Sequence, residues 1–239
     1  RVGINRVEWP MRFKAPKLPP STNLVPAFTG PRVAEGKYRI RLVKAKESRD
    51  GDVTLVADAR SKHSAADRAL QQKTAMQIYR DLERLTYVAD SASSTADQAK
   101  TRLLKTRRKG ALAVKLETLS ASLARMGKSL AATSEAGWLS GEEKLREKLG
   151  NLYGAVNQYE GRPTDSQINR IEALRAELEK AASLFQKLVD EDLAAVNGLL
   201  EKEKLERIAV LSLAEWMKKQ EAGGGAPGTP AESFLSAWR

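Results

Sequence analysis

The chain of 239 residues contains no cysteine and a single histidine, His63. The lack of cysteine excludes a disulfide framework and a metal site held by thiolates, and one histidine cannot build a multi-histidine metal site. No apolar run approaches the roughly 20 residues that a membrane-spanning helix needs. We therefore expect no cofactor, no metal site and no membrane-spanning segment.

Acidic residues are scarce in residues 1–63. The net charge is +11, of which residues 1–63 carry +8 and residues 64–239 carry +3. A basic region of this kind is suited to contact with an acidic surface of a neighbouring protein. Nucleic acid is the less favoured partner: the aromatic residues Trp9 and Tyr38 fall on apolar strand faces rather than among the cations, and no nucleic-acid-binding motif is present.

Residues 1–60 alternate between apolar and polar positions, which is typical of strands. The apolar sets are Val7, Trp9, Met11 and Phe13, then Tyr38, Ile40 and Leu42, then Val53, Leu55 and Ala57. Asp50-Gly51 is suited to a tight hairpin turn. Three strands are fewer than the about seven of an immunoglobulin-type sandwich. We therefore predict a partial immunoglobulin-like β-sandwich whose sheet is completed by strands from outside the chain.

Residues 64–220 have the pattern of a helical bundle. Hydroxyl residues three positions before a carboxylate or amide mark helix starts at Ser64, Ser140, Thr164 and Ser212. Thr95 marks either a further start or the interior of one long helix from Ser64 to about Lys105. Gly161-Arg-Pro163 predicts a break between two helices.

Apolar residues inside the helices step by three and four. The runs are Leu70, Ile78, Leu82, Leu85 and Ala89; Leu112, Leu116, Leu119, Leu123, Met126 and Leu130; Leu145, Leu149, Leu152 and Val156; and Ile171, Leu174, Leu178, Ala181, Phe185 and Leu188, after which the stripe shifts to Val189, Leu193, Val196 and Leu200. Such seams predict four main helices packed as an antiparallel bundle, with a short fifth near residues 213–220. The fold class is therefore α+β and mainly α. Residues 221–239 are predicted to be a flexible linker followed by a docking peptide with Phe234 and Trp238.

Candidate catalytic residues are few. His63 lies in a basic connection beside a helix start, and Glu142 and Glu143 occupy a helix-capping pattern. Adjacent carboxylates on a helix point apart, so neither this pair nor residues 190–192 can bracket a substrate. We expect no catalysis by this chain alone. Gly150 and Gly154 have the spacing of a close packing contact.

Three stretches together are similar to a known family. They are Gly3-Ile-Asn-Arg-Val-Glu-Trp-Pro-Met-Arg12, Gly30-Pro-Arg-Val-Ala-Glu-Gly-Lys-Tyr-Arg-Ile-Arg-Leu42 and Leu139-Ser-Gly-Glu-Glu-Lys-Leu-Arg-Glu-Lys-Leu-Gly150. The chain resembles the C-terminal region of large bacterial exported proteins with sialidase-type repeats in a sortilin-like β-propeller, often labelled glycosyl hydrolases. The resemblance implies export and a position outside the propellers. The family's aspartate-proline-arginine appears here as Asp58-Ala-Arg60, and no catalytic residue of the family maps onto this chain.

Two classes of function follow. The first is a non-catalytic structural or interaction module that belongs to an exported propeller protein or envelope assembly. The alternative is an accessory region of a glycoside hydrolase or peptide-processing enzyme whose chemistry lies elsewhere. In either case the partner is a protein with an acidic surface, either another part of the same polypeptide or another subunit. The predicted partner-contact residues are Trp9, Arg12, Tyr38, Arg39, Arg41, Phe234 and Trp238.

Overall fold

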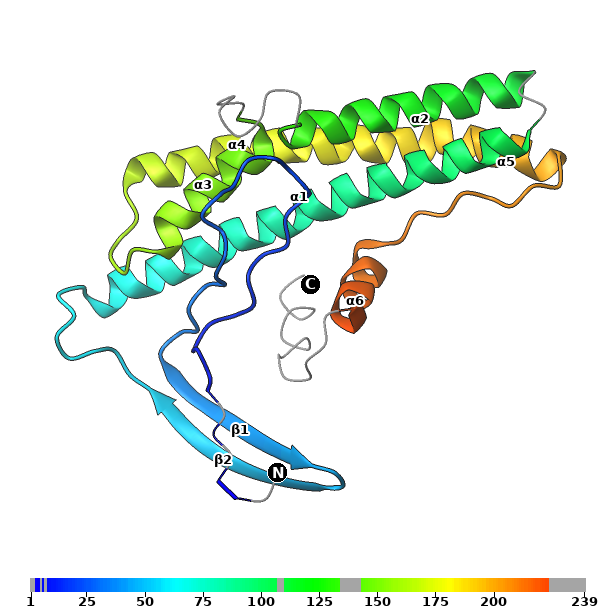
Figure 1. Ribbon diagram of the computed structural model, residues 1–239. Coiled ribbons are helices and arrows are strands. Elements are labelled where there is room, and N and C mark those ends of the chain that lie inside the picture. The colour runs from blue at the N-terminus through cyan, green and yellow to red at the C-terminus, as the bar shows by residue number, and fades with distance from the viewer. Residues whose placement is uncertain (1–2, 5, 7, 107–109, 134–142, 224–239) are drawn as a thin grey trace.

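A computed structural model describes residues 3–4, 6, 8–106, 110–133 and 143–223. This part of the chain is mainly helical, with one two-stranded sheet (Figure 1). The strands are β1 (Gly36–Lys44) and β2 (Glu47–Leu55). The helices are α1 (Ala65–Lys105), α2 (Ala111–Leu130), α3 (Leu145–Asn157), α4 (Asp165–Lys187), the π-helix η2 (Leu188–Leu193), α5 (Ala194–Lys202) and α6 (Leu213–Gly223).

Side-chain caps set the starts of α1, α4 and α6. The Ser64 hydroxyl accepts the N–H of Asp67 at 3.1 Å and starts α1, which continues through Thr95 as one helix of 41 residues. Thr164 and Gln167 cap α4 reciprocally. The predicted start at Ser140 lies outside the described residues, and the N-cap of α3 is Lys144. Both N–H groups that bond in a capping box are satisfied at the start of α4, as the sequence pattern predicts.

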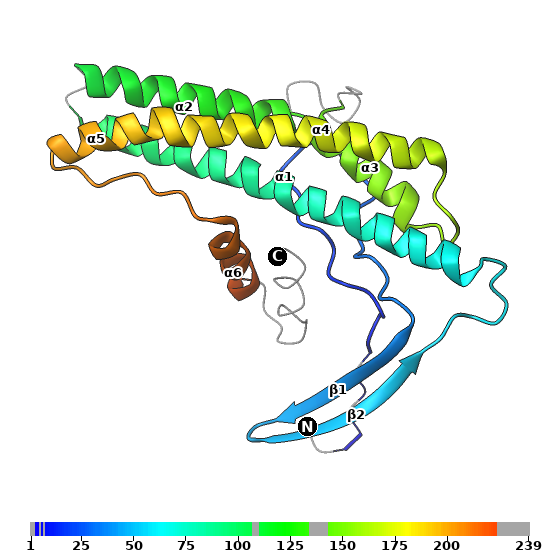
Figure 2. The same cartoon turned by 180° about the vertical axis from the view of Figure 1, so that it is seen from behind.

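The helices of the bundle form three columns rather than four, where a column is one helix or several helices placed end to end. α2 and α3 follow one another along α1: α3 packs on its first half and α2 on its second half (Figures 1 and 2). α4, η2 and α5 form one continuous third column. Two short helices can share one column because a single long α1 offers a groove that neither could fill alone.

The predicted seams form the core. Leu119, Leu149, Leu178 and Phe185 are all buried, which confirms the burial predicted from the heptad spacing. The shift of the stripe near Val189 has a structural cause, because the π-helix η2 occupies this point. A π-helical turn adds one residue to the helix, and the seam resumes one position later at Leu193.

Residues 14–31, which we call the strap, lie extended across α1 and α3. Val25 and Ala27 are buried in the bundle core. The backbone of Lys17 is held on both sides: its N–H donates to Glu83 Oε1 at 2.8 Å, and its carbonyl accepts the Thr86 hydroxyl at 2.7 Å. The part of the chain before α1 is therefore joined to the bundle through this segment.

The close contact predicted from Gly150 and Gly154 is made with the strap and not with another helix. A Cβ atom on Gly150 would lie 2.6 Å from a methyl carbon of Val25, and one on Gly154 would lie 2.3 Å from the Pro26 ring. Only a residue without a side chain allows the strap to approach α3 this closely.

The predicted third strand and the predicted turn are both wrong. Around residues 5–13 the described residues form only an isolated bridge between Arg12 and Arg32, and the sheet has two strands instead of three. The hairpin turns at Ala45, whose φ is +53°, while Gly51 lies inside β2 opposite Ile40. A turn at residues 50–51 would leave Tyr38 unpaired with β2, whereas the observed register pairs it with Val53.

The strap contact predicts that Gly154→Ala destabilises the fold. The new methyl group would force apart the strap and α3, and overpacking of this kind costs about 1–3 kcal/mol. Urea denaturation measures the change in the free energy of unfolding. Gly127→Ala in α2 is the matched control: a Cβ there meets no atom within 4 Å, so the control should be neutral or more stable. Equal effects of the two changes would contradict the contact.

The contact between the strap and Glu83 also predicts that the stability of the fold depends on pH. Burial raises the pKa of Glu83 above its ordinary value of 4.5. The folded state then binds this proton more tightly than the unfolded state, so the folded state loses stability as the pH rises from 4.5 through the raised pKa. Glu83→Gln keeps an oxygen that accepts the Lys17 N–H and removes the titration.

We therefore expect the free energy of unfolding of the unmodified chain to fall relative to that of E83Q across this pH window. Urea titrations at pH values between about 3.5 and 7.5 would measure the difference. The exposed Glu201→Gln is the matched control for the loss of a carboxylate. A parallel pH profile for E83Q would contradict the role of Glu83.

Candidate protein-interaction surface

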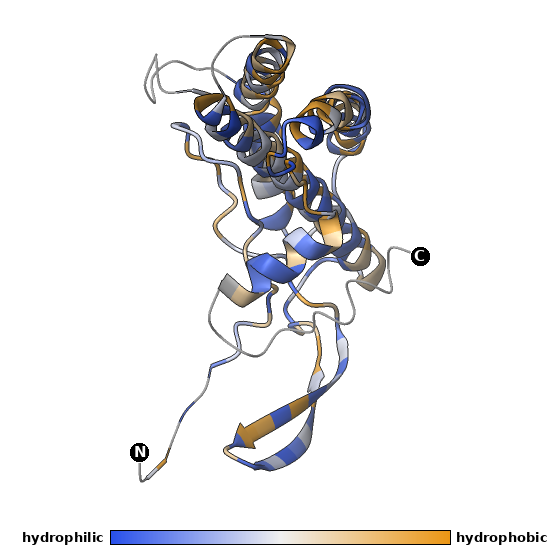
Figure 3. Ribbon diagram, turned by 90° about the vertical axis from the view of Figure 1, so that its right-hand side faces the viewer, coloured by the Kyte–Doolittle hydropathy of each residue, from blue (hydrophilic) through white to orange (hydrophobic). Residues whose placement is uncertain are grey.

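Strands β1 and β2 project away from the bundle as a hairpin, which we call the arm (Figures 1 and 3). No described helix packs against either strand. The strands pair with each other over nine residues, from Gly36 with Leu55 to Lys44 with Glu47. A two-stranded hairpin is marginally stable in water, and three or more strands or a covering helix are usually needed. The arm has neither within the described residues.

The outer half of the arm exposes apolar side chains. Ile40, Leu42 and Val43 are 49%, 62% and 64% exposed, and Figure 3 shows this apolar tip. The half nearer the bundle is better covered, because Trp9 packs edge-on against Tyr38 with ring centroids 5.4 Å apart. The uncovered apolar surface is therefore concentrated at the end that lies farthest from the bundle.

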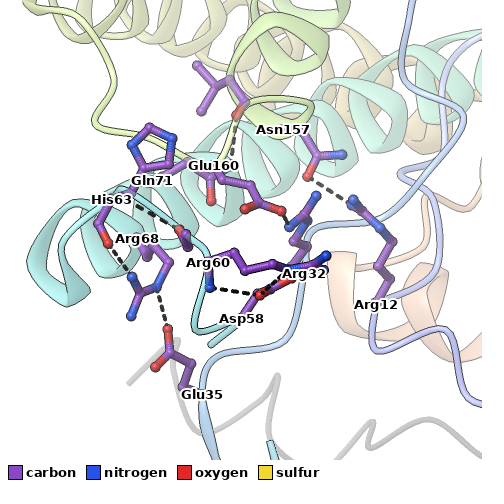
Figure 4. Close-up of polar contacts among 12 residues, drawn as sticks. Arg12, Arg32, Glu35, Asp58, Arg60, His63, Arg68, Gln71, Asn157 and Glu160 are labelled. Carbon is purple, nitrogen blue, oxygen red and sulfur yellow. Dashed lines mark hydrogen bonds and ion pairs between the residues drawn. The ribbon is translucent and has the colours of Figure 1, made fainter. Parts of the chain in front are cut away.

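Ion pairs anchor the base of the arm (Figure 4). Arg68 of α1 donates to Glu35 Oε1 at 2.6 Å, just before β1 begins. Arg32 pairs with Glu160, which lies between α3 and α4. These exposed pairs fix the direction of the arm more than they add stability, since surface ion pairs contribute little.

A cleft of about 600 Å³ lies between the arm base and the start of α1. Each of its three carboxylates faces an arginine: Glu35 with Arg68, Asp58 with Arg60, and Glu160 with Arg32. Hydrogen bonds from Arg68 and Arg60 lower the pKa of Glu35 and of Asp58, respectively. Carboxylates held ionised in this way cannot serve as general acids near neutral pH.

His63 lies beside this cleft and stacks edge-on against Tyr159 at 5.3 Å between ring centroids. Its own backbone carbonyl accepts a hydrogen bond from Arg68. The imidazole does not line the cleft, so it does not face the three carboxylates.

The predicted partner-contact residues fall into four groups. Trp9 and Tyr38 form the ring contact at the base of the arm, and Arg39 and Arg41 lie on one face of β1, opposite Asp52 and Asp50. Arg12 is directed inward, and it donates to the Gly30 carbonyl at 2.9 Å. Phe234 and Trp238 lie outside the described residues.

The sequence-based interpretation missed the strap and its anchor. Arg146 and Glu147 follow the first residue of α3 and were not singled out, although both are almost fully buried. Five prolines between residues 16 and 31 were a usable signal, because proline favours extended backbone over helix or central strand.

No family model matches the chain, and neither a curated protein nor a solved structure matches it. None of the described helices combines the length and apolar character needed to cross a membrane. The described residues also hold no group of three His, Asp or Glu side chains placed to bind a metal ion.

The isolation of the arm predicts weak protection of its amides from hydrogen exchange. Amides of β1 and β2 should exchange roughly 100-fold or more faster than buried amides of α1 near Ile78 and Leu85, because the arm can open without unfolding the bundle. Exchange followed by NMR at several urea concentrations measures both regions. Exchange of the arm amides together with those of α1 would contradict this prediction.

Proposed function

We propose that the chain is a non-catalytic assembly module that docks to a protein partner through the arm. The observation that carries the proposal is the pairing of nine-residue strands in a hairpin that no described helix covers. An exposed apolar strand with free edges is an aggregation hazard unless a partner covers it. The cleft does not favour catalysis, since its carboxylates are ion-paired.

The partner we propose is a protein with an acidic surface. The arm carries six Lys and Arg residues and three Asp and Glu residues, so it keeps a net charge of +3 after its own acids are counted. Charge complementarity of this kind steers association and suppresses incorrect partners. The resemblance to exported sortilin-like propeller proteins suggests a propeller body as that partner, in a periplasmic, outer-membrane or extracellular setting. In the alternative function the propeller is a glycoside hydrolase and the module remains its accessory.

Photo-crosslinking from the arm tests this proposal. Because the chain has no cysteine, Val43→Cys carries a photoreactive label at one site only. Val114→Cys in α2 is the matched control, since Val43 and Val114 are 64% and 63% exposed. We expect a partner protein to be crosslinked from position 43 and not from position 114.

The crosslinked protein is then purified and titrated calorimetrically against two forms of the chain. One form is complete, and the other has residues 37–54 replaced by a short glycine-serine turn. We expect binding to the complete chain and at least a tenfold loss of affinity without the arm. Equal binding by both forms, or the same crosslinks from positions 43 and 114, would refute the proposed function.

A further inference from the structure

The two edges of the arm differ in charge. On one face, β1 presents Lys37, Arg39 and Arg41, and β2 presents Asp50 and Asp52. Arg41 Nε donates to Asp50 Oδ1 at 2.8 Å, and Arg39 Nε lies 3.9 Å from Asp52 Oδ1. A strand added beside β1 would therefore lie against cations on this face, and one added beside β2 would lie against carboxylates.

On the opposite face of the arm, the β1 edge and the β2 edge differ in their apolar residues. Tyr38, Ile40 and Leu42 of β1 lie on it, and the register places Gly51 opposite Ile40 and Arg49 opposite Leu42. No side chain of β2 covers Ile40, because glycine has none. A strand beside β1 would bury Ile40 and Leu42, whereas a strand beside the outer half of β2 would gain no apolar contact.

The backbone of β1 is open to such a strand. With a two-residue turn, Lys44 and Glu47 close the hairpin as a hydrogen-bonded pair, and hydrogen-bonded and non-hydrogen-bonded pairs then alternate. The N–H and carbonyl groups of residues 37, 39, 41 and 43 therefore point away from β2. None of them bonds to another segment of the described chain.

We infer that the edge of β1 receives a partner strand in which acidic and apolar side chains alternate. The inference rests on the proposed function and specifies the edge and the chemistry of its partner. The acids lie beside Lys37, Arg39 and Arg41, and the apolar residues lie beside Tyr38, Ile40 and Leu42. Strand addition of this kind takes affinity from the backbone and specificity from alternate side chains.

A second copy of the chain fits this edge less well. Pairing β1 with β1 of another copy brings Arg39 and Arg41 near like charges. The β2 strand of another copy offers Asp50 and Asp52, but it places Gly51 between them where the edge calls for an apolar side chain. An acidic strand from a different protein surface satisfies both faces.

Two labelled peptides test the chemistry of the partner strand by fluorescence anisotropy with the full chain. The first is acetyl-Thr-Glu-Val-Glu-Ile-Glu-Thr-amide, and in the second lysine replaces each glutamate. We expect the acidic peptide to bind at least tenfold more tightly. No binding of the acidic peptide at millimolar concentration, or equal binding of both peptides, would overturn the inference.

Matched proline variants test the edge. Val43 and Ser48 lie opposite one another in a non-hydrogen-bonded pair, so proline at either position removes an outward N–H without removing a bond of the ladder. Val43→Pro should weaken binding of the acidic peptide at least tenfold, and Ser48→Pro should leave it unchanged. The reverse result would assign the β2 edge and overturn the inference.

Charge variants make the test independent of proline. The double change Arg39→Gln and Arg41→Gln should weaken binding about fivefold or more, because cross-strand charge pairs contribute to strand association. The double change Asp50→Asn and Asp52→Asn should leave binding unchanged or strengthen it, since it removes acids that compete for the arginines.

The outcomes also separate this inference from the proposed function. If the crosslinked protein needs the arm but neither proline variant weakens binding, docking uses a face of the arm, and only the inference fails. If the protein does not need the arm, the proposed function fails as well. Self-association in sedimentation velocity that Val43→Pro or Ser48→Pro abolishes would identify a second copy as the occupant and overturn the inference.

Discussion

The fold depends on one buried carboxylate, that of Glu147 at the start of α3. One of its oxygens accepts the Ser21 hydroxyl at 2.7 Å and Arg146 Nη1 at 2.8 Å. The other accepts the backbone N–H groups of Ala132 at 3.1 Å and Lys144 at 3.2 Å. A charge 1% exposed is tolerated only when its lone pairs are satisfied in this way, so the strap, the end of α2 and the start of α3 must all be in place together.

Arg146 extends the same constraint along the strap. Its Nε donates to the Pro19 carbonyl and its Nη1 to the Asn23 carbonyl, each at 2.8 Å. The strap lacks regular secondary structure, so these side-chain bonds replace the ladder that its backbone would otherwise need. Because the strap leads directly into β1, its anchoring determines where the arm leaves the bundle. The bundle core and the arm are thus connected through the strap, which combines these polar contacts with the buried side chains of Val25 and Ala27, rather than through a shared sheet.

Sequence alone predicted the helices well because their signals are local. Leu112 to Leu130 repeat the heptad spacing, and the hydroxyl of Thr164 lies three residues before Gln167. The arm was predicted only in part, since Ala45 is a weaker turn signal than Asp50-Gly51, and the cross-strand pairs decided the register. The anchoring of the strap by Arg146 and Glu147 joins residues more than 120 positions apart, and no local pattern reports such a contact. That α2 and α3 share one column likewise depends on the length of α1.

The attachment of the arm has a mechanical consequence. Both of its ends return to the same end of the bundle, where Arg68 pairs with Glu35 and Arg32 pairs with Glu160 (Figure 4). A pull on the tip of the arm would therefore reach these surface ion pairs first and the strap contacts next. Through β2, tension would also pass along residues 56–64 to the first turn of α1. Detachment under force would begin with the arm swinging about its base, and the three columns would still be intact when it did.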